Sequence, residues 1–244
     1  MMWQYYYAGE SHLVVELGST IDLSINSDVH ALAGALVALQ PRGLREVVPS
    51  YRSLMIFYDP LVITAPELRA ICQGLMKFKA ICRPHQREVL EIPVRYGGEL
   101  GPDLEQVAEE TSLTTEEVVA MHVRRAYAVY MIGFLPGFPY LGGLDPRLSL
   151  PRLKVPRTKV PTGSVAIAEL QTGVYPLSSP GGWRIIGRTP LRFFNIAESP
   201  PSLLRPGQWV RFRSVSGDEY AEIADLVKAN RFRPRVVLMD AEHA

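Results

Sequence analysis

The chain has 244 residues, with 26 Lys and Arg against 25 Asp and Glu, so its formal net charge is +1. Hydrophobic residues make up 47% of the chain and charged residues 21%, as in an ordinary globular protein. These values exclude a generally basic nucleic-acid binder, an acidic solvating tail, and collagen-like, coiled-coil or disordered chains. The length accommodates one large domain or two small ones.

Neither a membrane span nor a disulfide framework is expected. The longest apolar run, residues 31–39, is far shorter than the roughly 20 residues that cross a bilayer. The N-terminal residues lack a basic region followed by an apolar one, so we expect no signal peptide. Cys72 and Cys82 lack metal-binding spacing, and we expect both to be small buried hydrophobes. Together these features predict a cytoplasmic protein that does not bind a membrane.

The first 86 residues predict a small α+β domain. Four short strands are expected, at 3–8, 12–17, 44–49 and 53–58. Ser24 or Ser27 can cap a helix that runs to about Gln40. The capping box Thr64–Glu67 opens a second helix that runs to about Lys79. This order predicts an antiparallel sheet with both helices packed on one face.

The polar break at 83–86 is the expected boundary, and residues 87–244 predict a mainly-β, barrel-like domain with a helical insert. Helices are expected at 103–110 and after a second capping box at 114–117, which places His122 on a helix face. The expected strands are 89–96, 126–134, 164–170, 173–176, 184–187, 191–195 and 208–214. A C-terminal extension follows, with a helix at 216–229 and an extended segment at 231–238.

Charge and proline concentrate in this second part. Residues 147–213 hold eleven Lys and Arg against two acids, a net charge of +9, so the rest of the chain carries −8. Twelve of the 20 prolines lie between Pro136 and Pro206, a density incompatible with mostly helical structure. The basic residues either cover solvated strands and loops or form a surface for an anionic ligand or an acidic partner. No nucleic-acid-binding motif accompanies them, so nucleic acid is not an expected partner.

Common catalytic motifs are missing from the sequence. There is no phosphate-binding loop, dinucleotide fingerprint, HExxH or GxSxG pattern. The five histidines are scattered without metal-ligand spacing, so we expect no metal site. The unusual segments are instead 133–143 and 161–190, which combine glycine, proline and aromatic residues. Such rigid loops suit a binding site, since little ordering entropy is lost on binding. Alternatively, they only form the tight corners of a barrel.

The same segments carry a resemblance. Residues 133–142 (GFLPGFPYLG), 161–165 (PTGSV), 171–176 (QTGVYP), 179–183 (SPGGW) and 186–190 (IGRTP) resemble the signature of the PxpB/KipI family. Upstream, 93–98 (PVRYGG), 101–104 (GPDL) and His122 match as well, so the resemblance spans about residues 8–215 with order and spacing kept. Thr162 stands where family members usually have alanine. Several long motifs in order are far more specific than one short pattern.

The resemblance implies a function and partners. Family members are B subunits of the bacterial ATP-dependent 5-oxoprolinase, which opens 5-oxoproline to glutamate together with an A subunit and a KipA-like C subunit. Others are KipI-type inhibitors of a histidine kinase, which is the alternative function here. Some carry the label allophanate hydrolase subunit 1, and similar domains occur in urea carboxylase. The resemblance also implies a cyclophilin-like fold for the barrel. The sequence offers no nucleotide motif, so we expect ATP with Mg to be bound by the complex, and the chain to be inactive alone.

Site residues follow from this chemistry. ATP-coupled opening of a lactam would phosphorylate the amide oxygen, which requires cations and backbone donors around the developing charge. Arg184 and Arg188, with the N–H groups of Gly181 and Gly182, are the candidates for that role, and His122 is the candidate general acid or base. The expected substrate- or partner-binding residues are Phe134, Pro136, Gly137, Phe138, Tyr140, Pro161, Gly163, Ser164, Gln171, Thr172, Tyr175, Pro180, Gly181, Gly182, Trp183 and Thr189.

Each candidate has a structural alternative. His122 lies beside valines on a helix and is about as readily a packed residue. Arg184 and Arg188 alternate with Ile186, so they could only mark the polar face of a strand. Trp183 and Tyr175, and likewise the three aromatic residues of 134–140, are residue types typical of cores and interfaces.

Overall fold

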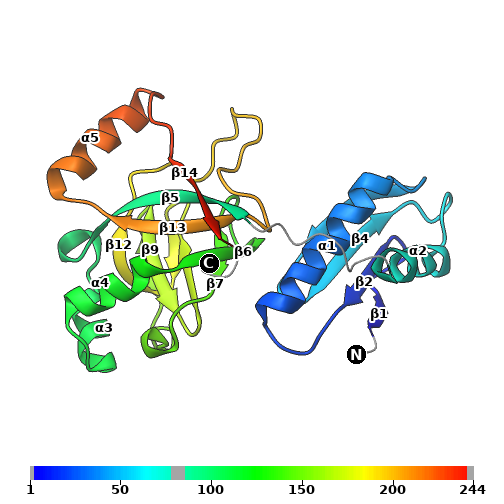
Figure 1. Ribbon diagram of the computed structural model, residues 1–244, viewed down its shortest axis with the longest axis horizontal. Coiled ribbons are helices and arrows are strands. Elements are labelled where there is room, and N and C mark those ends of the chain that lie inside the picture. Colours follow the sequence, from blue (N-terminus) through cyan, green and yellow to red (C-terminus); the bar gives the residue numbers. More distant parts are fainter. Residues whose placement is uncertain (1–2, 78–85, 241–244) are drawn as a thin grey trace. The chain divides into compact units, whose positions relative to one another are not determined.

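The computed structural model describes residues 3–77 and 86–240 (Figure 1). Its internal contacts divide the chain into two compact units, residues 1–84 and 85–244. Each unit has its own hydrophobic core. Within the described ranges, no helix is both long enough and apolar enough to cross a membrane.

The first unit is an antiparallel sheet covered by two helices. Its strands are β1 (Gln4–Tyr7), β2 (His12–Glu16), β3 (Leu44–Pro49) and β4 (Ser53–Tyr58), in the order β1-β2-β4-β3. Alternate residues of β2 and β4 are buried, which leaves one face of the sheet for the core. Helices α1 (Leu23–Leu39) and α2 (Ala65–Lys77) supply the rest of that core. The expected α+β layout is confirmed.

The helix caps of this unit differ in how well they were predicted. The capping box of α2 forms as expected, because Thr64 N–H donates to Glu67 Oε2 at 2.8 Å and Glu67 N–H to Thr64 Oγ1 at 3.4 Å. The expected cap of α1 at Ser24 or Ser27 is wrong. Asp22 caps this helix instead, since its extended backbone lets Oδ1 accept from the N–H of Ser24 and Ile25. The predicted end of α2 at Lys79, and Cys82, lie outside the described residues.

The second unit is built on a closed mixed β-barrel (Figure 1). Its strands are β5 (Gln86–Tyr96), β6 (Ala126–Ile132), β7 (Pro139–Gly142), β9 (Ser164–Ala168), β10 (Gln171–Val174), β12 (Arg184–Arg188) and β13 (Trp209–Ser214). The order β12-β9-β10-β7-β6-β13-β5 closes through a β12–β5 pairing, and β13 runs parallel to β5. The predicted barrel is therefore confirmed.

Further elements surround the barrel. Strand β14 (Val236–Asp240) pairs with β5, while β8 (Arg157–Val160) and β11 (Ser179–Gly181) form a separate two-stranded ribbon. Helices α3 (Leu104–Thr111) and α4 (Thr115–Arg124) lie together at one end, and α5 (Gly217–Lys228) lies outside the strands (Figure 1). Short 3₁₀ turns span Gly98–Leu100 and Pro146–Leu148. The helical insert at α3 and α4, with its Thr114–Glu117 capping box, matches the prediction.

Several strand predictions in this unit need correction. Residues 191–195 form no strand, because Thr189 Oγ1 accepts the Leu191 N–H and only one bridge, Phe194 to Ser202, forms. The expected strand 126–134 ends at Ile132, and Phe134 adopts a positive φ of 66°. The strand expected at 173–176 lies two residues earlier, as β10 (Gln171–Val174). In the extended segment expected at 231–238, the strand β14 begins only at Val236. Strands β7, β8 and β11 were not predicted, since each has only three or four residues next to proline or glycine.

Candidate functional site

The signature segments meet on the outer side of strand β9. Along this strand Val165 and Ile167 point into the barrel core, whereas Ala166 and Ala168 belong to a second hydrophobic cluster. That second cluster also contains Phe138, Val160, Tyr175, Trp183 and Ile185. The segments 133–143 and 175–183 therefore bury aromatic residues on one face of the sheet.

An aromatic cluster, comprising Phe138, Tyr140, Tyr175 and Trp183, forms the centre of this face. The ring of Phe138 lies 4.9 Å from Tyr140, 5.2 Å from Tyr175 and 5.7 Å from Trp183, measured between centroids. The contacts with Tyr175 and Trp183 are edge-to-face, the arrangement that aromatic quadrupoles favour. Because Phe138, Tyr175 and Trp183 are buried, the core alternative describes them better than substrate contact.

Phe134 lies at the edge of this cluster and is exposed. Its ring packs against Phe138 at 5.6 Å, yet 63% of the residue remains accessible. A positive φ is uncommon for a bulky residue, so the loop holds Phe134 in a strained conformation. Arg152 also lies near the cluster, with its guanidinium carbon 5.9 Å from the Trp183 ring centroid.

Close backbone contacts explain the glycine of the 161–165 motif. Gly163 has φ +79°, and a Cβ atom there would lie 2.3 Å from the Thr189 carbonyl oxygen. The Gly163 N–H donates to the Tyr175 carbonyl at 2.7 Å, and the Thr189 N–H donates to the Gly163 carbonyl at 2.9 Å. Three signature blocks are thus joined through one residue that has to be glycine.

Arg184 is engaged in structural contacts. Its Nη1 and Nη2 donate to the two carboxylate oxygens of Glu110, each at 2.9 Å, and its Nε donates to the Pro151 carbonyl at 3.1 Å. This bidentate hydrogen bonding lowers the pKa of Glu110. The Arg184 side chain is only 7% exposed. Arg184 therefore connects β12 to α3, a role that favours the structural alternative.

Arg188 and Ser164 have a different environment. The β12–β9 register places them opposite each other, so their side chains lie on the same face of the sheet. Ser164 Oγ and Arg188 Nε are both buried, and neither has a hydrogen-bond partner among the described residues. In the β12–β5 pairing that closes the barrel, Arg188 stands opposite Arg95, and Arg95 is exposed. A buried donor pair without an acceptor is costly, and an anionic or carbonyl oxygen would satisfy it.

His122 lies inside the barrel in a complete hydrogen-bond network. Its Nδ1 lies 2.7 Å from Tyr96 Oη and its Nε2 lies 2.9 Å from Thr172 Oγ1. Thr172 Oγ1 donates to the Ala166 carbonyl, so it accepts from Nε2–H, and Nδ1 accepts from the Tyr96 hydroxyl. The imidazole is therefore the neutral Nε2–H tautomer.

Burial keeps this imidazole neutral. It lowers the pKa of His122 to about 3 and raises the pKa of Tyr96 well above its ordinary value. His122 also stacks on Phe212, with ring centroids 4.5 Å apart. A neutral, fully buried histidine with both nitrogens bonded matches the packed alternative better than a general acid or base. Its catalytic role stays a prediction.

The predicted site residues thus fall into three groups. His122 and Thr172 lie in the barrel interior, and the aromatic residues lie in or beside the outer cluster. The third group, Ser164, Arg188 and Thr189, lies where β9 begins and β12 ends. Pro161, Gln171, Pro180, Gly181 and Gly182 flank these groups, and Gly137, with φ +79°, packs its backbone against the Phe193 carbonyl.

Sequence reasoning missed two acidic partners, the buried Asp103 and the exposed Glu110. Asp103 accepts from the Ile185 N–H at 2.6 Å and pairs with Arg157 Nη2 at 2.5 Å. Glu110 pairs with Arg184, as described above. The sequence placed both acids on the predicted helix 103–110 but gave no signal for their arginine partners. Among residues 3–77 and 86–240, no cluster of three His, Cys, Asp or Glu could hold a metal ion.

Comparisons with known proteins place the chain in a family. Residues 3–204 match the model of the carboxyltransferase domain, subdomain C and D. The chain is 43% identical to the 5-oxoprolinase B subunit of Bacillus subtilis over 223 residues, 87% of this chain and 92% of that protein. It belongs to the family of 5-oxoprolinase B subunits. The corresponding protein of Escherichia coli O157:H7 is 40% identical over 208 residues, 85% of this chain and 94% of that one.

Solved structures agree with this family assignment. The crystal structure of TTHA0988 is 40% identical with a TM-score of 0.74; the match covers 85% of this chain and 40% of that longer one. A conserved uncharacterized protein from Pyrococcus horikoshii is 44% identical, with a TM-score of 0.53, and the match covers 89% of this chain and all of that one. The Kluyveromyces lactis urea amidolyase is 21% identical with a TM-score of 0.76, covering 98% of this chain and 16% of that one, a likeness in fold alone.

Proposed function

We propose that this chain is the B subunit of an ATP-dependent 5-oxoprolinase and acts with the A and C subunits in a cytosolic complex that hydrolyses 5-oxoproline to glutamate. The observation that carries the proposal is the 40–43% identity to named B subunits over most of the chain. The domain division at 86/87 and a cyclophilin-like topology of the barrel are parts of the same proposal.

Arg188 and Ser164 are the residues of this chain that we place at the reaction site. Opening the lactam develops negative charge on the ring oxygen, and preorganised donors stabilise such charge most strongly where water is excluded. Ser164 Oγ and Arg188 Nε are buried donors without partners in the described structure, and Arg188 adds a positive charge. This arrangement supports a role in holding an anionic or carbonyl oxygen of the substrate.

ATP and Mg do not fit a complete site on this chain. Mg²⁺ prefers carboxylate and phosphate oxygens, and the described ranges offer no acidic cluster for it. The sequence has no nucleotide-binding loop. We therefore propose that the complex binds ATP with Mg, which would supply the phosphoryl group that activates the amide. The B subunit would complete the site at an interface and be inactive alone.

The test is 5-oxoproline-dependent ATP hydrolysis and glutamate release. The assay compares this chain alone, with the C subunit, and with the A and C subunits together. We expect activity only in the complete mixture. If properly folded and associated partners give no activity in any combination, the proposal fails, and binding to a histidine kinase becomes the function to test.

Variants of the arginines test the site itself. In the complete mixture, we expect Arg188→Ala to lower kcat by about 10²-fold or more, because one donor to a developing oxyanion is lost. Arg205→Ala is the matched control, since Arg205 is exposed and its loss removes the same charge. Full activity of Arg188→Ala in an associated complex would remove Arg188 from the mechanism.

A further inference from the structure

A cavity of about 440 Å³ lies between the loop after β12 and the segment that follows α5. Its lining residues are Leu191, Arg192, Glu198, Leu203, Val227, Asn230, Phe232, Arg233 and Pro234. None of these residues belongs to the signature motifs or to the site described above. The cavity is therefore a separate feature of the second unit.

The floor of the cavity is apolar. Leu191 is 4% exposed and belongs to the barrel core, and Leu203, Val227 and Phe232 are partly buried against the same core. Backbone hydrogen bonds hold these walls in place. The Leu203 N–H donates to the Phe193 carbonyl at 2.9 Å, and the Phe232 N–H donates to the Leu226 carbonyl at 3.3 Å. The apolar floor is thus part of the folded core rather than of a loose surface loop.

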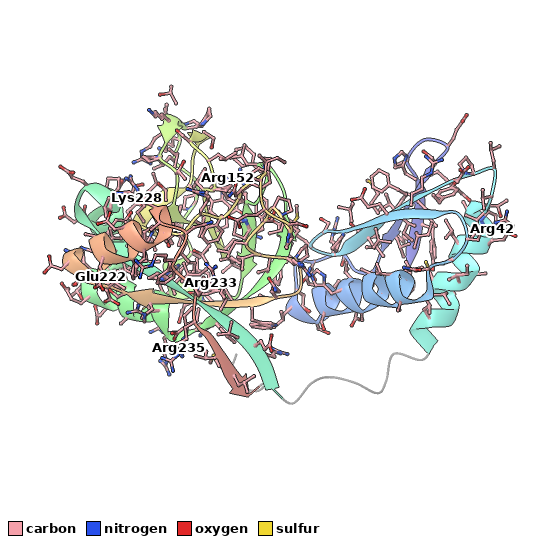
Figure 2. The ribbon with its side chains drawn as sticks, turned by 90° about the horizontal axis from the view of Figure 1, so that it is seen from above. Arg42, Arg152, Glu222, Lys228, Arg233 and Arg235 are labelled. Carbon is pink, nitrogen blue, oxygen red and sulfur yellow. The ribbon has the colours of Figure 1, made fainter. Side chains whose placement is uncertain are left out.

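Two arginines from different segments line the same cavity. Arg192 is exposed and has no hydrogen bond or ion pair among the described residues. Arg233 uses Nη1 to donate to the carbonyls of Asn230 and Phe232, which leaves Nε and Nη2 available. Figure 2 shows Arg233 on the segment that follows the orange helix α5, beyond the labelled Lys228. Two guanidinium groups at one cavity favour a carboxylate ligand.

A single acid completes the lining. Glu198 Oε1 accepts from Asn195 Nδ2 at 2.9 Å, which orients this carboxylate and leaves Oε2 without a described partner. A carboxylate that lines the same cavity as the two arginines would accept an N–H group of a ligand. The net charge of the three ionised side chains is +1, which suits a ligand of one net negative charge or a zwitterion.

We propose that this cavity binds a small carboxylate that carries an N–H group on the carbon next to it: an amino acid or its cyclised lactam. The arginines bind the carboxylate, Glu198 accepts the N–H, and the apolar floor packs against the body of the ligand. The choice of probes rests on the proposed function, whose substrate and product belong to this class. Binding is measured without catalysis, so failure of one proposal is distinguishable from failure of the other.

Isothermal titration of the full chain with 5-oxo-L-proline and with L-glutamate tests this site. We expect saturable binding of at least one probe, and at least about tenfold weaker binding in Arg192→Ala and in Arg233→Ala, because each variant loses charge-assisted hydrogen bonds. Arg231→Ala is the matched control: Arg231 is an exposed arginine of the same segment that does not line the cavity. Unchanged melting temperatures establish that the variants are folded.

A further variant distinguishes binding of the amino acid from binding of the lactam. Glu198→Gln should weaken binding of the charged amine of glutamate more than binding of the neutral lactam. Absence of saturable binding at millimolar probe concentrations would overturn the proposal. Equal weakening by Arg231→Ala, or equal affinity for acetate, would overturn it as well, since the interaction would then be one of general charge.

Discussion

The buried imidazole of His122 should make the barrel unit sensitive to acid. The unfolded chain takes up a proton at His122 near the ordinary pKa of 6.5, whereas the folded chain does so only near pH 3. Between these values the unfolded state binds more protons, so the free energy of unfolding falls as the pH falls. Each pH unit costs about 1.4 kcal/mol once the unfolded histidine is protonated. From pH 6.5 to 4.5 the loss is about 2 kcal/mol, because the unfolded histidine is only half protonated at pH 6.5.

A variant without the titrating group isolates this effect. His122→Gln is expected to be less stable than the parent at pH 7.5, because it breaks the bonds to Tyr96 and Thr172. As the pH falls to 4.5, the gap between parent and variant should narrow by about 3 kcal/mol, since only the parent loses the His122 contribution. The raised pKa values of Tyr96 and Tyr127 keep both phenols neutral throughout this range.

The measurement is denaturant unfolding followed by tryptophan fluorescence. Both proteins carry Trp3→Phe, so that Trp183 and Trp209 report on the second unit alone. Nitrogen NMR of the imidazole in the folded protein gives an independent reading, with His122 staying in the neutral Nε2–H form down to about pH 4. A stability gap that is constant with pH, or an imidazole that titrates near pH 6.5 in the folded state, would refute this reasoning and restore His122 as a candidate acid or base.

Two further substitutions test the packing of the signature face. Gly163→Ala should destabilise the second unit by more than about 1 kcal/mol, since it combines a positive φ with a Cβ atom 2.3 Å from a carbonyl oxygen. Gly217→Ala, which meets open space, should leave the melting temperature nearly unchanged. Phe138→Ala should cost about 3–5 kcal/mol in denaturant unfolding, because the ring is 1% exposed. Phe134→Ala, at 63% exposure, should cost less than about 0.5 kcal/mol. A large loss at Phe134 or none at Phe138 would contradict the described packing.

Features that depend on neighbouring residues could be predicted from the sequence. The capping boxes at Thr64 and Thr114 formed as expected, because a cap involves only residues three positions apart. The alternating strands of the first sheet were also recognisable, since burial on one face imposes a period of two. The family followed from long motifs whose order is kept along the chain.

Features that join distant residues were decided by the tertiary structure. Barrel closure pairs Gly187 with Tyr96, and the Glu110–Arg184 ion pair joins residues 74 positions apart. Residues 191–195 have a strand-like pattern, yet Thr189 takes a backbone donor there and no ladder forms. The same limit applies to chemistry. His122 and Arg188 were equal candidates in the sequence, because a pKa or an unpartnered donor depends on burial. Burial is set by residues from many segments, and only the folded chain brings them together.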